Sequence, residues 1–545
     1  MRPSTASTGD PFRARLSKDT KHLPRNKHGP MNQTPEPVVL AHAHTTGLPP
    51  PKASEDPKHG PSIGRSTLIN ILGLLVPTVV GLATVPLYLH QIGEIRYGVL
   101  LLAFTFLGYF GAFDLGLGRA VAQRVARQDS VQDRNHTFWT AFLLSTGMGI
   151  IGAILLYFLG QWLFAAIFRI PAELRPEMEN AVPWLAAIVP LTAVISVLAG
   201  ALEARQSFVA LNLSQMTGVI GLQILPLAAA MLGHSSMPVL LAAALAGRLL
   251  GVAVMIATTA RALPFYGLPH IHRPEIGPLL RFGGWVSVSG LVTPLLTIVD
   301  RFFIGTMLGA AAVTAYTVPY NLTQRFTYLP AALSTALFPR FARGGNSENA
   351  QQILNEGIRG LVAIQTPFIV LGILLIYPFF NLWIGPDLTR RAAPVAIMLL
   401  VGIWINGPAY LPHNWMPAQG RPDLMARFYL AELLPFLALL WWLVDLWGIM
   451  GAALAWVTRS TADAAFCFVA TGTTRTYGIA SGITLLPVAI ATIMALTQNP
   501  LFVYIPGGFI TLLVAIALSF FLLPKPIKHR IHAWWHRSAK PVWEP

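Results

Sequence analysis

The sequence predicts an all-α, polytopic membrane protein with about fourteen transmembrane helices. The chain of 545 residues is 54% hydrophobic and only 11% charged, whereas an average soluble domain has about 25% charged residues. Its apolar residues lie in stretches of about 20, the length that a helix needs to cross a bilayer. Most charged residues inside these stretches are arginines. The connections are too short for a large extramembrane catalytic domain.

The predicted elements form two sets of six spans, followed by two more. Residues 1–66 are rich in Pro, His, Lys and Arg, which predicts a disordered basic cytoplasmic tail. The N-terminal lobe, 67–262, has spans near 67–89, 97–118, 138–160, 181–202, 209–231 and 238–262. After a proline-containing linker, 263–280, the C-terminal lobe, 281–471, has spans near 281–305, 312–337, 357–380, 393–416, 424–444 and 447–471. Two additional spans within 481–523, near 481–497 and 502–523, precede a basic cytoplasmic tail, 524–545.

The distribution of arginine predicts the orientation. With the N-terminus in the cytoplasm, the inner loops carry fourteen arginines and the outer loops five. An even number of spans then places both termini in the cytoplasm. The same bias explains the net charge of +15, so we expect no nucleic-acid binding. A single cysteine, Cys467, excludes an intrachain disulfide and a cysteine-based metal cluster. No cofactor or metal site is predicted.

The two sets of six spans carry matching motifs. Ile92-Gly93 is echoed by Leu308-Gly309, and the RVAR motif at 124–127 by RFAR at 340–343. Both pairs are 216 residues apart and lie at corresponding places in the two sets. The halves therefore have the same orientation, which predicts a pseudo-two-fold axis along the membrane normal and a site between the lobes.

These motifs resemble a known family, the oligosaccharide flippases of the multidrug/oligosaccharidyl-lipid/polysaccharide exporter superfamily. The resemblance covers residues 65–523. It is carried by 89–98 (LHQIGEIRYG), 113–120 (FDLGLGRA) and 124–127 in the first half, and by 300–305 (DRFFIG), 308–309, 315–316, 336–343 (ALFPRFAR) and 420–422 (GRP) in the second.

The resemblance implies a two-lobed, V-shaped helical transporter with a central cavity and no enzymatic activity. The implied substrate is a lipid-linked oligosaccharide on undecaprenyl pyrophosphate. It would move from the inner to the outer leaflet of the bacterial inner membrane for polysaccharide biosynthesis. Possible partners are the bilayer and the polysaccharide polymerase or export machinery. The family pattern has no counterpart for the long basic tail before Arg65.

Two mid-span arginines are the first candidates for substrate binding. Arg248 lies in the sixth span and Arg325 in the eighth, and neither span contains an acidic residue. A charge in the membrane interior is costly, so each needs a partner from another span, water or an anionic ligand. Because the planar guanidinium forms paired hydrogen bonds with phosphate, we expect both arginines to face one cavity and hold the pyrophosphate. The alternative is an interhelical structural salt bridge.

Another group of polar residues lies in the last spans of the C-terminal lobe. Arg459 and Asp463 are four residues apart on one helical face, so this pair is predicted to neutralise itself structurally, and a gating or coupling role is the alternative. Glu432, inside the eleventh span, is a candidate for carrying a coupling proton or for pairing with an arginine. Trp404 and Asn406, near a span end, are predicted to be interface anchors, with a sugar-binding role as the less favoured alternative.

The remaining candidates lie near span ends. Arg119, at the predicted cytoplasmic end of the second span, is a candidate for contacting a headgroup that enters from the cytoplasm. Asp300 and Arg301, near the predicted outer end of the seventh span, either form a gate or extend to the interface.

The same charge pattern bears on three other classes of function. A cation-coupled multidrug exporter of the same superfamily would use intramembrane acids, whereas the mid-span charges here are mainly arginines. A flippase for a lipid-linked peptidoglycan precursor would also need arginines for an anionic headgroup, so the sequence leaves this alternative open. A membrane enzyme, such as a polymerase or glycosyltransferase, needs a large loop with clustered acids that this chain lacks.

Overall fold

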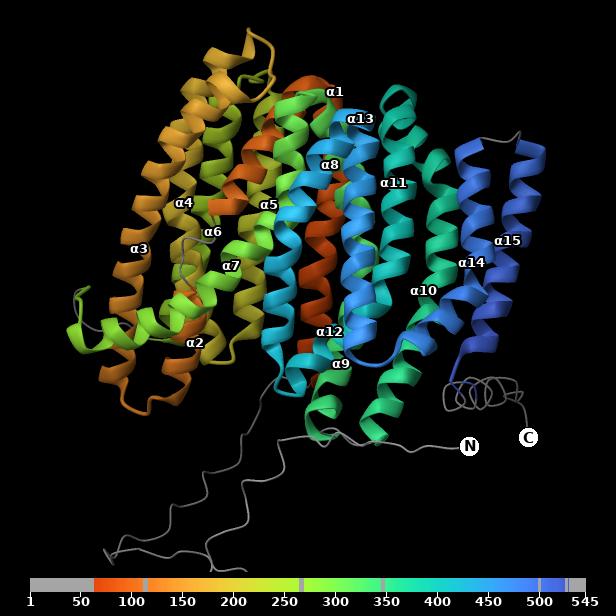
Figure 1. Cartoon of the computed structure of the whole chain (residues 1–545). Coiled ribbons are helices and arrows are strands. Elements are labelled where there is room, and N and C mark those ends of the chain that lie inside the picture. The colour runs from red at the N-terminus through yellow and green to blue at the C-terminus, as the bar shows by residue number, and fades with distance from the viewer. Residues whose placement is uncertain are drawn as a thin grey trace, which may run out of the picture. The chain divides into compact units, whose positions relative to one another are not determined.

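A computed structural model describes residues 63–110, 116–263, 269–344, 348–497, 501–524 and 528. Over these residues all regular secondary structure is helical (Figure 1), which confirms the predicted all-α fold. Ten described stretches are long and apolar enough to cross a bilayer. Residues 1–62 and most of 524–545 lie outside the described part, so the predicted tails are not tested. Residues 63–66, which the sequence predicts to belong to the tail, instead begin the first helix.

The first half of the chain forms six α-helices and one π-turn. They are α1 (Ile63–Phe110), α2 (Leu117–Arg127), α3 (Val131–Trp162), η2 (Leu163–Ile167), α4 (Leu174–Ala204), α5 (Phe208–Met231) and α6 (Met237–Ala262). Two predicted spans merge in α1, where Gly93 breaks the helix with φ 75° and ψ 168°. A positive φ favours glycine because it has no Cβ atom. The predicted span 97–118 is divided, since α1 ends at Phe110 and α2 begins at Leu117.

The described residues of the second half also form helices. Its elements are α7 (Arg273–Met307), α8 (Ala310–Thr323), the 3-10 turn η3 (Gln324–Thr327), α9 (Tyr328–Gly344), α10 (Glu348–Trp383), α11 (Pro386–Asn406), the 3-10 turn η4 (Gly407–Ala409), α12 (Tyr410–Ala418), α13 (Pro422–Ala470), α14 (Thr474–Thr497) and α15 (Leu501–Leu522). Two predicted spans merge in α13, which is broken at Gly448. The predicted linker is corrected, because residues 273–280 are already part of α7.

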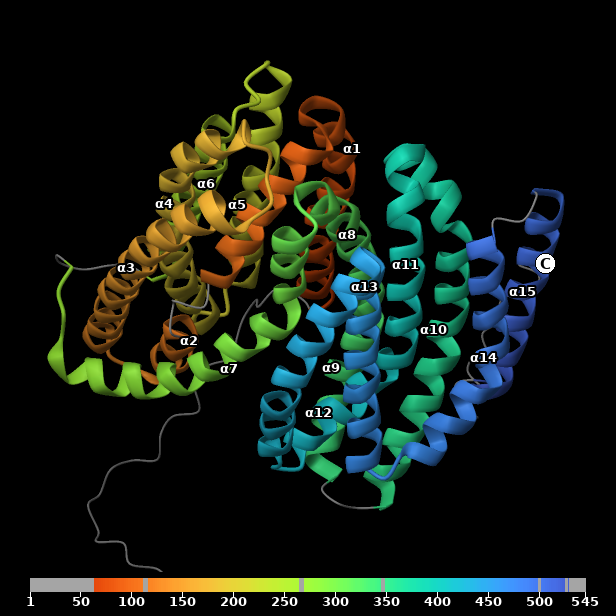
Figure 2. The same cartoon turned by 45° about the horizontal axis from the view of Figure 1, so that its top comes forward.

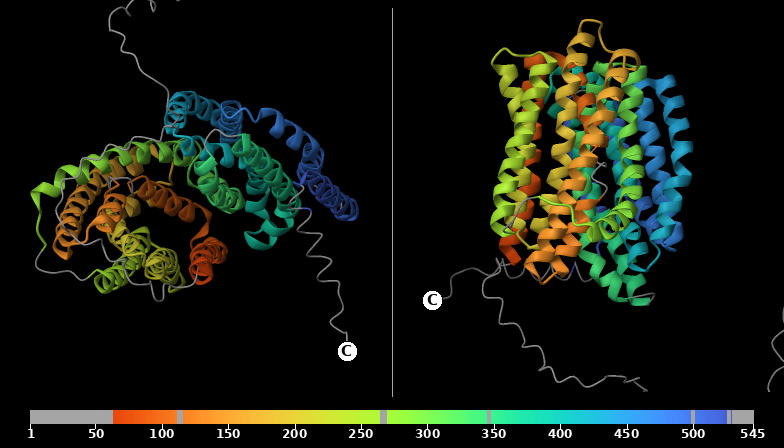
Figure 3. Two further views of the ribbon diagram at one scale, coloured as in Figure 1. Left: turned by 90° about the horizontal axis from the view of Figure 1, so that it is seen from below. Right: turned by 90° about the vertical axis from the view of Figure 1, so that its left-hand side faces the viewer.

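The helices pack mainly with others of the same half of the chain. In the first half, α3 and α6 both contact α4, and α5 contacts α6 and α1. In the second half, α11 contacts α10 and α13, while α14 and α15 both pack on α10 (Figures 1 and 2). Most helices run roughly along one direction when seen from the side (Figure 3, right), as expected for a bundle that crosses a bilayer.

Two helices connect the first half to the second. The start of α7 contacts α2 and α3, and the same helix later contacts α8 and α13 (Figure 2). Glu275, in the first turn of α7, accepts hydrogen bonds from two nitrogens of Arg124 at 2.9 and 3.0 Å and from Thr137 at 3.0 Å. The second segment of α1 packs on α8. These contacts bring the two halves together around α1, α7 and α8.

One backbone feature supports the predicted repeat. Gly309, which separates α7 from α8, has φ 91° and ψ 178°, close to the conformation of Gly93. Each glycine follows the first span of its half, at the positions that the motif comparison pairs. The matching RVAR and RFAR motifs also lie alike, at the ends of α2 and α9. The division into two pseudo-symmetric lobes stays a prediction, and these similarities favour it.

Candidate functional site

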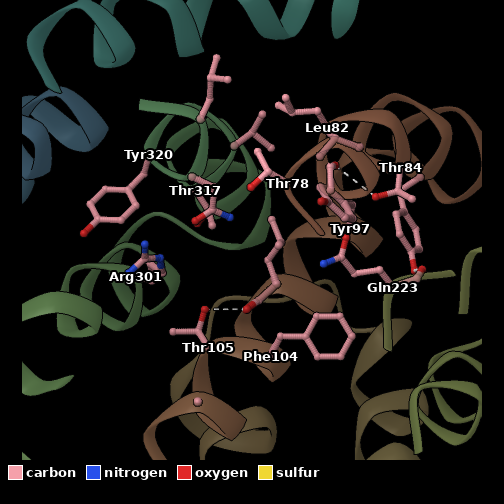
Figure 4. A pocket seen from close by; sticks show the side chains of 18 of the residues that line it. Thr78, Leu82, Thr84, Tyr97, Phe104, Thr105, Gln223, Arg301, Thr317 and Tyr320 are labelled. Carbon is pink, nitrogen blue, oxygen red and sulfur yellow. Dashed lines mark hydrogen bonds between the residues drawn. The ribbon is translucent and has the colours of Figure 1, made fainter. Parts of the chain in front are cut away.

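A cavity of about 520 Å³ lies where the first and second halves meet (Figure 4). Five helices contribute to its wall: both segments of α1, together with α5, α7, α8 and α10. Most of the wall is apolar or carries hydroxyl and amide groups. The polar and aromatic residues that line it include Thr78, Thr84, Tyr88, Tyr97, Thr105, Gln223, Thr297, Thr317, Tyr320 and Asn321. The hydroxyl and amide groups of this wall can bond to a hydrophilic group inside the bilayer.

Only two of the described lining residues are charged, and both are arginines. They are Arg301 of α7 and Arg325 of η3, whereas no Asp or Glu of the described chain lines this cavity. The charged side chains that line the described wall are therefore all cationic. Two arginines without a lining acid suit an anionic ligand better than a cationic one.

Arg301 is fixed by its surroundings. It is buried, with 6% of its surface exposed, and its Nη1 donates to the Thr297 carbonyl oxygen at 2.9 Å and to Asp300 Oδ1 at 3.3 Å. Its guanidinium carbon lies 4.2 Å from the ring centroid of Tyr320. Asp300 also accepts a 2.6 Å hydrogen bond from the Tyr316 hydroxyl. The expectation that this pair extends to the interface is wrong, because both residues are buried; a gating role stays a prediction.

Arg325 is held more loosely. It lies in the 3-10 turn between α8 and α9, its side chain is exposed, and it donates a hydrogen bond to the Tyr328 hydroxyl. None of the salt bridges in the described residues includes Arg325. Its charge is therefore available to a ligand in the cavity, whereas Arg301 shares its charge with Asp300.

Arg248 does not line this cavity. It lies where α5 and α6 pack closely, and a Cβ atom on Gly218 of α5 would be 3.9 Å from its Nη1. Its Nε is buried without a hydrogen-bond partner in the described structure, and no salt bridge there includes it. The structure thus separates Arg248 from Arg325, contrary to the expectation of a shared cavity, and places Arg301 with Arg325 instead.

A smaller cavity of about 280 Å³ lies beside the central one, within the second half. Thr297 and Tyr320 line both cavities. The wall of the smaller cavity, which we call the side cavity, is completed by Leu296, Gln324, Thr327, Ile403, Asn406, Gly407, Ala409, Tyr410, His413, Tyr429, Trp456, Arg459, Ser460 and Asp463.

The polar residues around the side cavity pair differently from the prediction. Arg459 bonds to Glu432 at 3.3 Å, across the two segments of α13, and not to Asp463. Asp463 Oδ2 instead accepts a 3.0 Å hydrogen bond from Asn406. The predicted self-neutralising Arg459–Asp463 pair is therefore wrong. Asn406 is not an interface anchor, and neither is Trp404, which is 6% exposed and donates to Thr366.

Arg119 lies apart from both cavities. It is exposed in the first turn of α2 and belongs to neither wall. The prediction that it contacts an entering headgroup is not tested by this position.

The two halves are in close contact at the end of the bundle that carries Gly93 and Gly309. Thr314 of α8 donates to the Glu94 carbonyl oxygen at 2.8 Å, and Glu94 forms a 2.6 Å salt bridge with Arg391 of α11. Arg169 donates its backbone N–H to Gly305 at 3.0 Å and its Nη1 to Met307 at 2.6 Å. This end of the bundle carries the predicted outer loops, and here the halves are closed against each other.

Solved structures share this fold. The Lipid II flippase MurJ in an inward closed conformation superimposes with a TM-score of 0.68 at 14% identity, covering 86% of this chain and all of that one. An inward-facing multidrug resistance MATE family transporter of the MOP superfamily gives a TM-score of 0.61 at 16% identity, covering 75% of this chain and 98% of that one. These likenesses establish the fold. Together with the membrane-length helices, they define a multi-pass membrane protein that has the fold of these transporters.

Sequence comparison then gives the family. The model of a polysaccharide biosynthesis protein family matches residues 94–389, more than half of the chain, and the chain belongs to this family. A relative from Shigella flexneri, named "Putative O-antigen transporter", is 26% identical over 408 residues, which cover 74% of this chain and 96% of the relative. The predicted resemblance to polysaccharide flippases is confirmed.

Proposed function

We propose that this transporter flips a lipid-linked oligosaccharide on undecaprenyl pyrophosphate from the inner to the outer leaflet of the bacterial inner membrane. The observation that carries the proposal is a cavity between the two halves whose charged lining residues, over the described chain, are Arg301 and Arg325. Membership of a polysaccharide biosynthesis family and the similarity to the Shigella relative support the same substrate class.

The chemistry of the substrate fits this wall. A pyrophosphate is strongly anionic and accepts paired hydrogen bonds, which guanidinium groups donate in a matching planar geometry. Arg301 is oriented in advance by Thr297 and Tyr320, while Arg325 brings a charge that no carboxylate of the described chain neutralises. The hydroxyl and amide groups of the wall are suited to sugar hydroxyls. No covalent step is required, in keeping with transporter relatives.

The proposed direction depends on the orientation. If both termini lie in the cytoplasm, the contacts around Glu94, Arg169 and Arg391 lie on the outer side, and this closure favours entry of substrate from the cytoplasm. Cysteines placed at Asp129 and Asp387 in a Cys467→Ser background test this orientation. The reagent should reach Asp129→Cys only from the cytoplasm and Asp387→Cys only from outside. The opposite pattern in intact cells would refute the orientation.

The function is tested with purified protein in liposomes and a labelled undecaprenyl-pyrophosphate oligosaccharide. We expect Arg325→Ala to lower the rate of leaflet exchange about tenfold or more, since a hydrogen bond to a charged group contributes about 1.5–3 kcal/mol. Arg325→Lys should restore only part of the rate, because a point charge replaces a planar fork. Arg390→Ala is the control, since Arg390 is exposed and belongs to neither cavity wall. Transport by Arg325→Ala at the wild-type rate would refute the cavity role.

Substituting the cargo separates the remaining alternatives. A peptidoglycan precursor on the same lipid carrier would satisfy the same arginines, so it is assayed in parallel as a competitor. A cationic drug would meet two arginines and no acid in the described wall, which disfavours multidrug export. On the outer face, the flipped product would be consumed by a polymerase or export machinery, which we propose as the functional partner.

A further inference from the structure

We infer that the side cavity is a saccharide-binding subsite that holds the sugar ring nearest the pyrophosphate. This inference rests on the proposed function. At about 280 Å³, the side cavity is close to the lower limit of about 300 Å³ for small-ligand pockets, so it suits one sugar ring better than a whole oligosaccharide. It opens beside the arginine-lined cavity, with Thr297 and Tyr320 in both walls.

Unpartnered polar atoms are concentrated around this space. Gln324 Nε2, Arg459 Nε and Asp463 Oδ1 all belong to side-cavity residues, and each is buried without a hydrogen-bond partner in the described structure. Buried polar groups are nearly always hydrogen-bonded in folded proteins. Here two donors and one acceptor surround one cavity, so an occupant that both donates and accepts would satisfy them. The hydroxyl groups of a sugar do both.

Aromatic rings supply the complementary surface. Tyr410, Tyr429 and Trp456 lie in the wall, and Trp456 is buried with 7% of its surface exposed. Tyr429 is positioned by a 2.8 Å hydrogen bond between its hydroxyl and His413. A sugar ring has apolar C–H faces and polar edges, so it can pack its faces on aromatic rings while its edges bond to Gln324 and Asp463.

A line of contacts connects the two cavities. Arg301 stacks on Tyr320 at 4.2 Å, and the Tyr320 ring meets Trp456 edge-on, with centroids 6.2 Å apart. Figure 4 shows Arg301 and Tyr320 next to each other at the edge of the central cavity. A pyrophosphate held by Arg301 would therefore place the first sugar one aromatic ring away, at the entrance to the side cavity.

The lining favours a sugar over a bare metal ion. One carboxylate, Asp463, lines the side cavity, while Glu432 is paired with Arg459. No group of three or more His, Cys, Asp or Glu side chains in the described chain is arranged to hold a metal. A hard cation such as Ca²⁺ needs six to eight oxygen ligands. Asp463 has one oxygen bonded to Asn406, and its other oxygen would accept a charge-assisted bond from a sugar hydroxyl.

The test compares lipids with and without a sugar. Full-length protein in detergent is titrated with undecaprenyl pyrophosphate, and with the same lipid carrying a single glucose or N-acetylglucosamine. At least one sugar-bearing lipid should bind about tenfold more tightly than the bare lipid. Gln324→Ala should reduce this gain in affinity by a factor of about three to ten, which is the range expected for one neutral hydrogen bond. It should change binding of the bare lipid by less than about twofold, because no side-chain partner in the protein is lost.

Two further variants make the result specific. Asp463→Asn should also reduce the sugar-dependent gain, and Gln352→Ala, an exposed glutamine on α10, should leave both affinities unchanged. If the sugar-bearing lipids bind no better than the bare lipid, the subsite is overturned and the proposed function stands. The same holds if Gln324→Ala weakens the binding of both kinds of lipid equally. If no lipid binds, the proposed function fails and the subsite with it. If Asp463→Asn alters only the pH dependence of transport, the cavity carries a proton and the inference is overturned.

Discussion

Gly98→Ala should destabilise the closed contact between α1 and α8. The two helices approach so closely that a Cβ atom on Gly98 would lie 1.9 Å from the Ala310 carbonyl oxygen, 2.6 Å from its carbon and 2.8 Å from Thr314 Oγ1. Two of these atoms are backbone, so a change of side-chain rotamer cannot relieve the overlap. The helices must separate by roughly 1 Å or more to restore ordinary contact.

The magnitude follows from a comparison with a second glycine. Gly147 lies inside α3, and a Cβ atom there would have no neighbour within 4 Å. Both substitutions gain the better helix propensity of alanine, about 1 kcal/mol, but only Gly98→Ala adds an overlap. Overpacking costs about 1–3 kcal/mol, and the short distance to backbone places Gly98 toward the upper end of this range.

The assay measures the apparent melting temperature of the two variants in the same detergent. The readout is the loss of monodisperse protein as the temperature rises. Gly98→Ala should melt a few degrees below Gly147→Ala, with Gly98→Leu lower still. The contact also brings Glu94 to Thr314, so the same substitution should increase the labelling, from the predicted outer side, of a cysteine introduced at Glu94. Equal melting temperatures for Gly98→Ala and Gly147→Ala would show that α1 and α8 do not approach each other this closely at Gly98.

Three further perturbations have defined outcomes. Glu275→Gln should lower the melting temperature, because breaking its paired bonds to Arg124 costs about 1–3 kcal/mol; an unchanged value would mean that the start of α7 is held by other contacts. Arg391→Ala should change stability by less than about 1 kcal/mol, because its pair with Glu94 is half exposed, whereas cysteines at both positions joined by a short crosslinker should stop transport. Transport by fully crosslinked protein would show that this end need not open. Arg248→Ala should leave binding of undecaprenyl pyrophosphate unchanged, and tenfold weaker binding would return this residue to the site.

The spans were predictable because their length is set by the bilayer, but their ends were not. The structure starts α3 at Val131 and α10 at Glu348, whereas the apolar pattern placed the starts near 138 and 357. These first turns are polar, so hydropathy does not register them, although they are helical. Hydropathy also cannot show that two successive spans meet at Gly93, and two others at Gly448, with almost no loop between them.

The pairing of buried charges depends on how helices face one another, which a single sequence does not give. Spacing alone put Arg459 beside Asp463, yet the break at Gly448 folds the two segments of α13 so that Glu432 reaches Arg459 first. Arg301 was identified, but its adjacency to Asp300 gave no hint of its place in a cavity wall. That place depends on Tyr320 from the next helix, and on no local pattern.

The 3-10 turn that carries Arg325 changes the phase of its span. A 3-10 helix turns about 120° and rises about 2.0 Å per residue, compared with about 100° and 1.5 Å in an α-helix. Over the four residues of η3, the difference amounts to a rotation of about 80° and an extension of about 2 Å. The side chains of α9 are therefore offset around the axis from those that a continuous α-helix after α8 would present. Rewinding this single turn as α-helix would rotate the whole of Tyr328–Gly344 by that angle, so these four residues determine which side chains of α9 face α10 and α12.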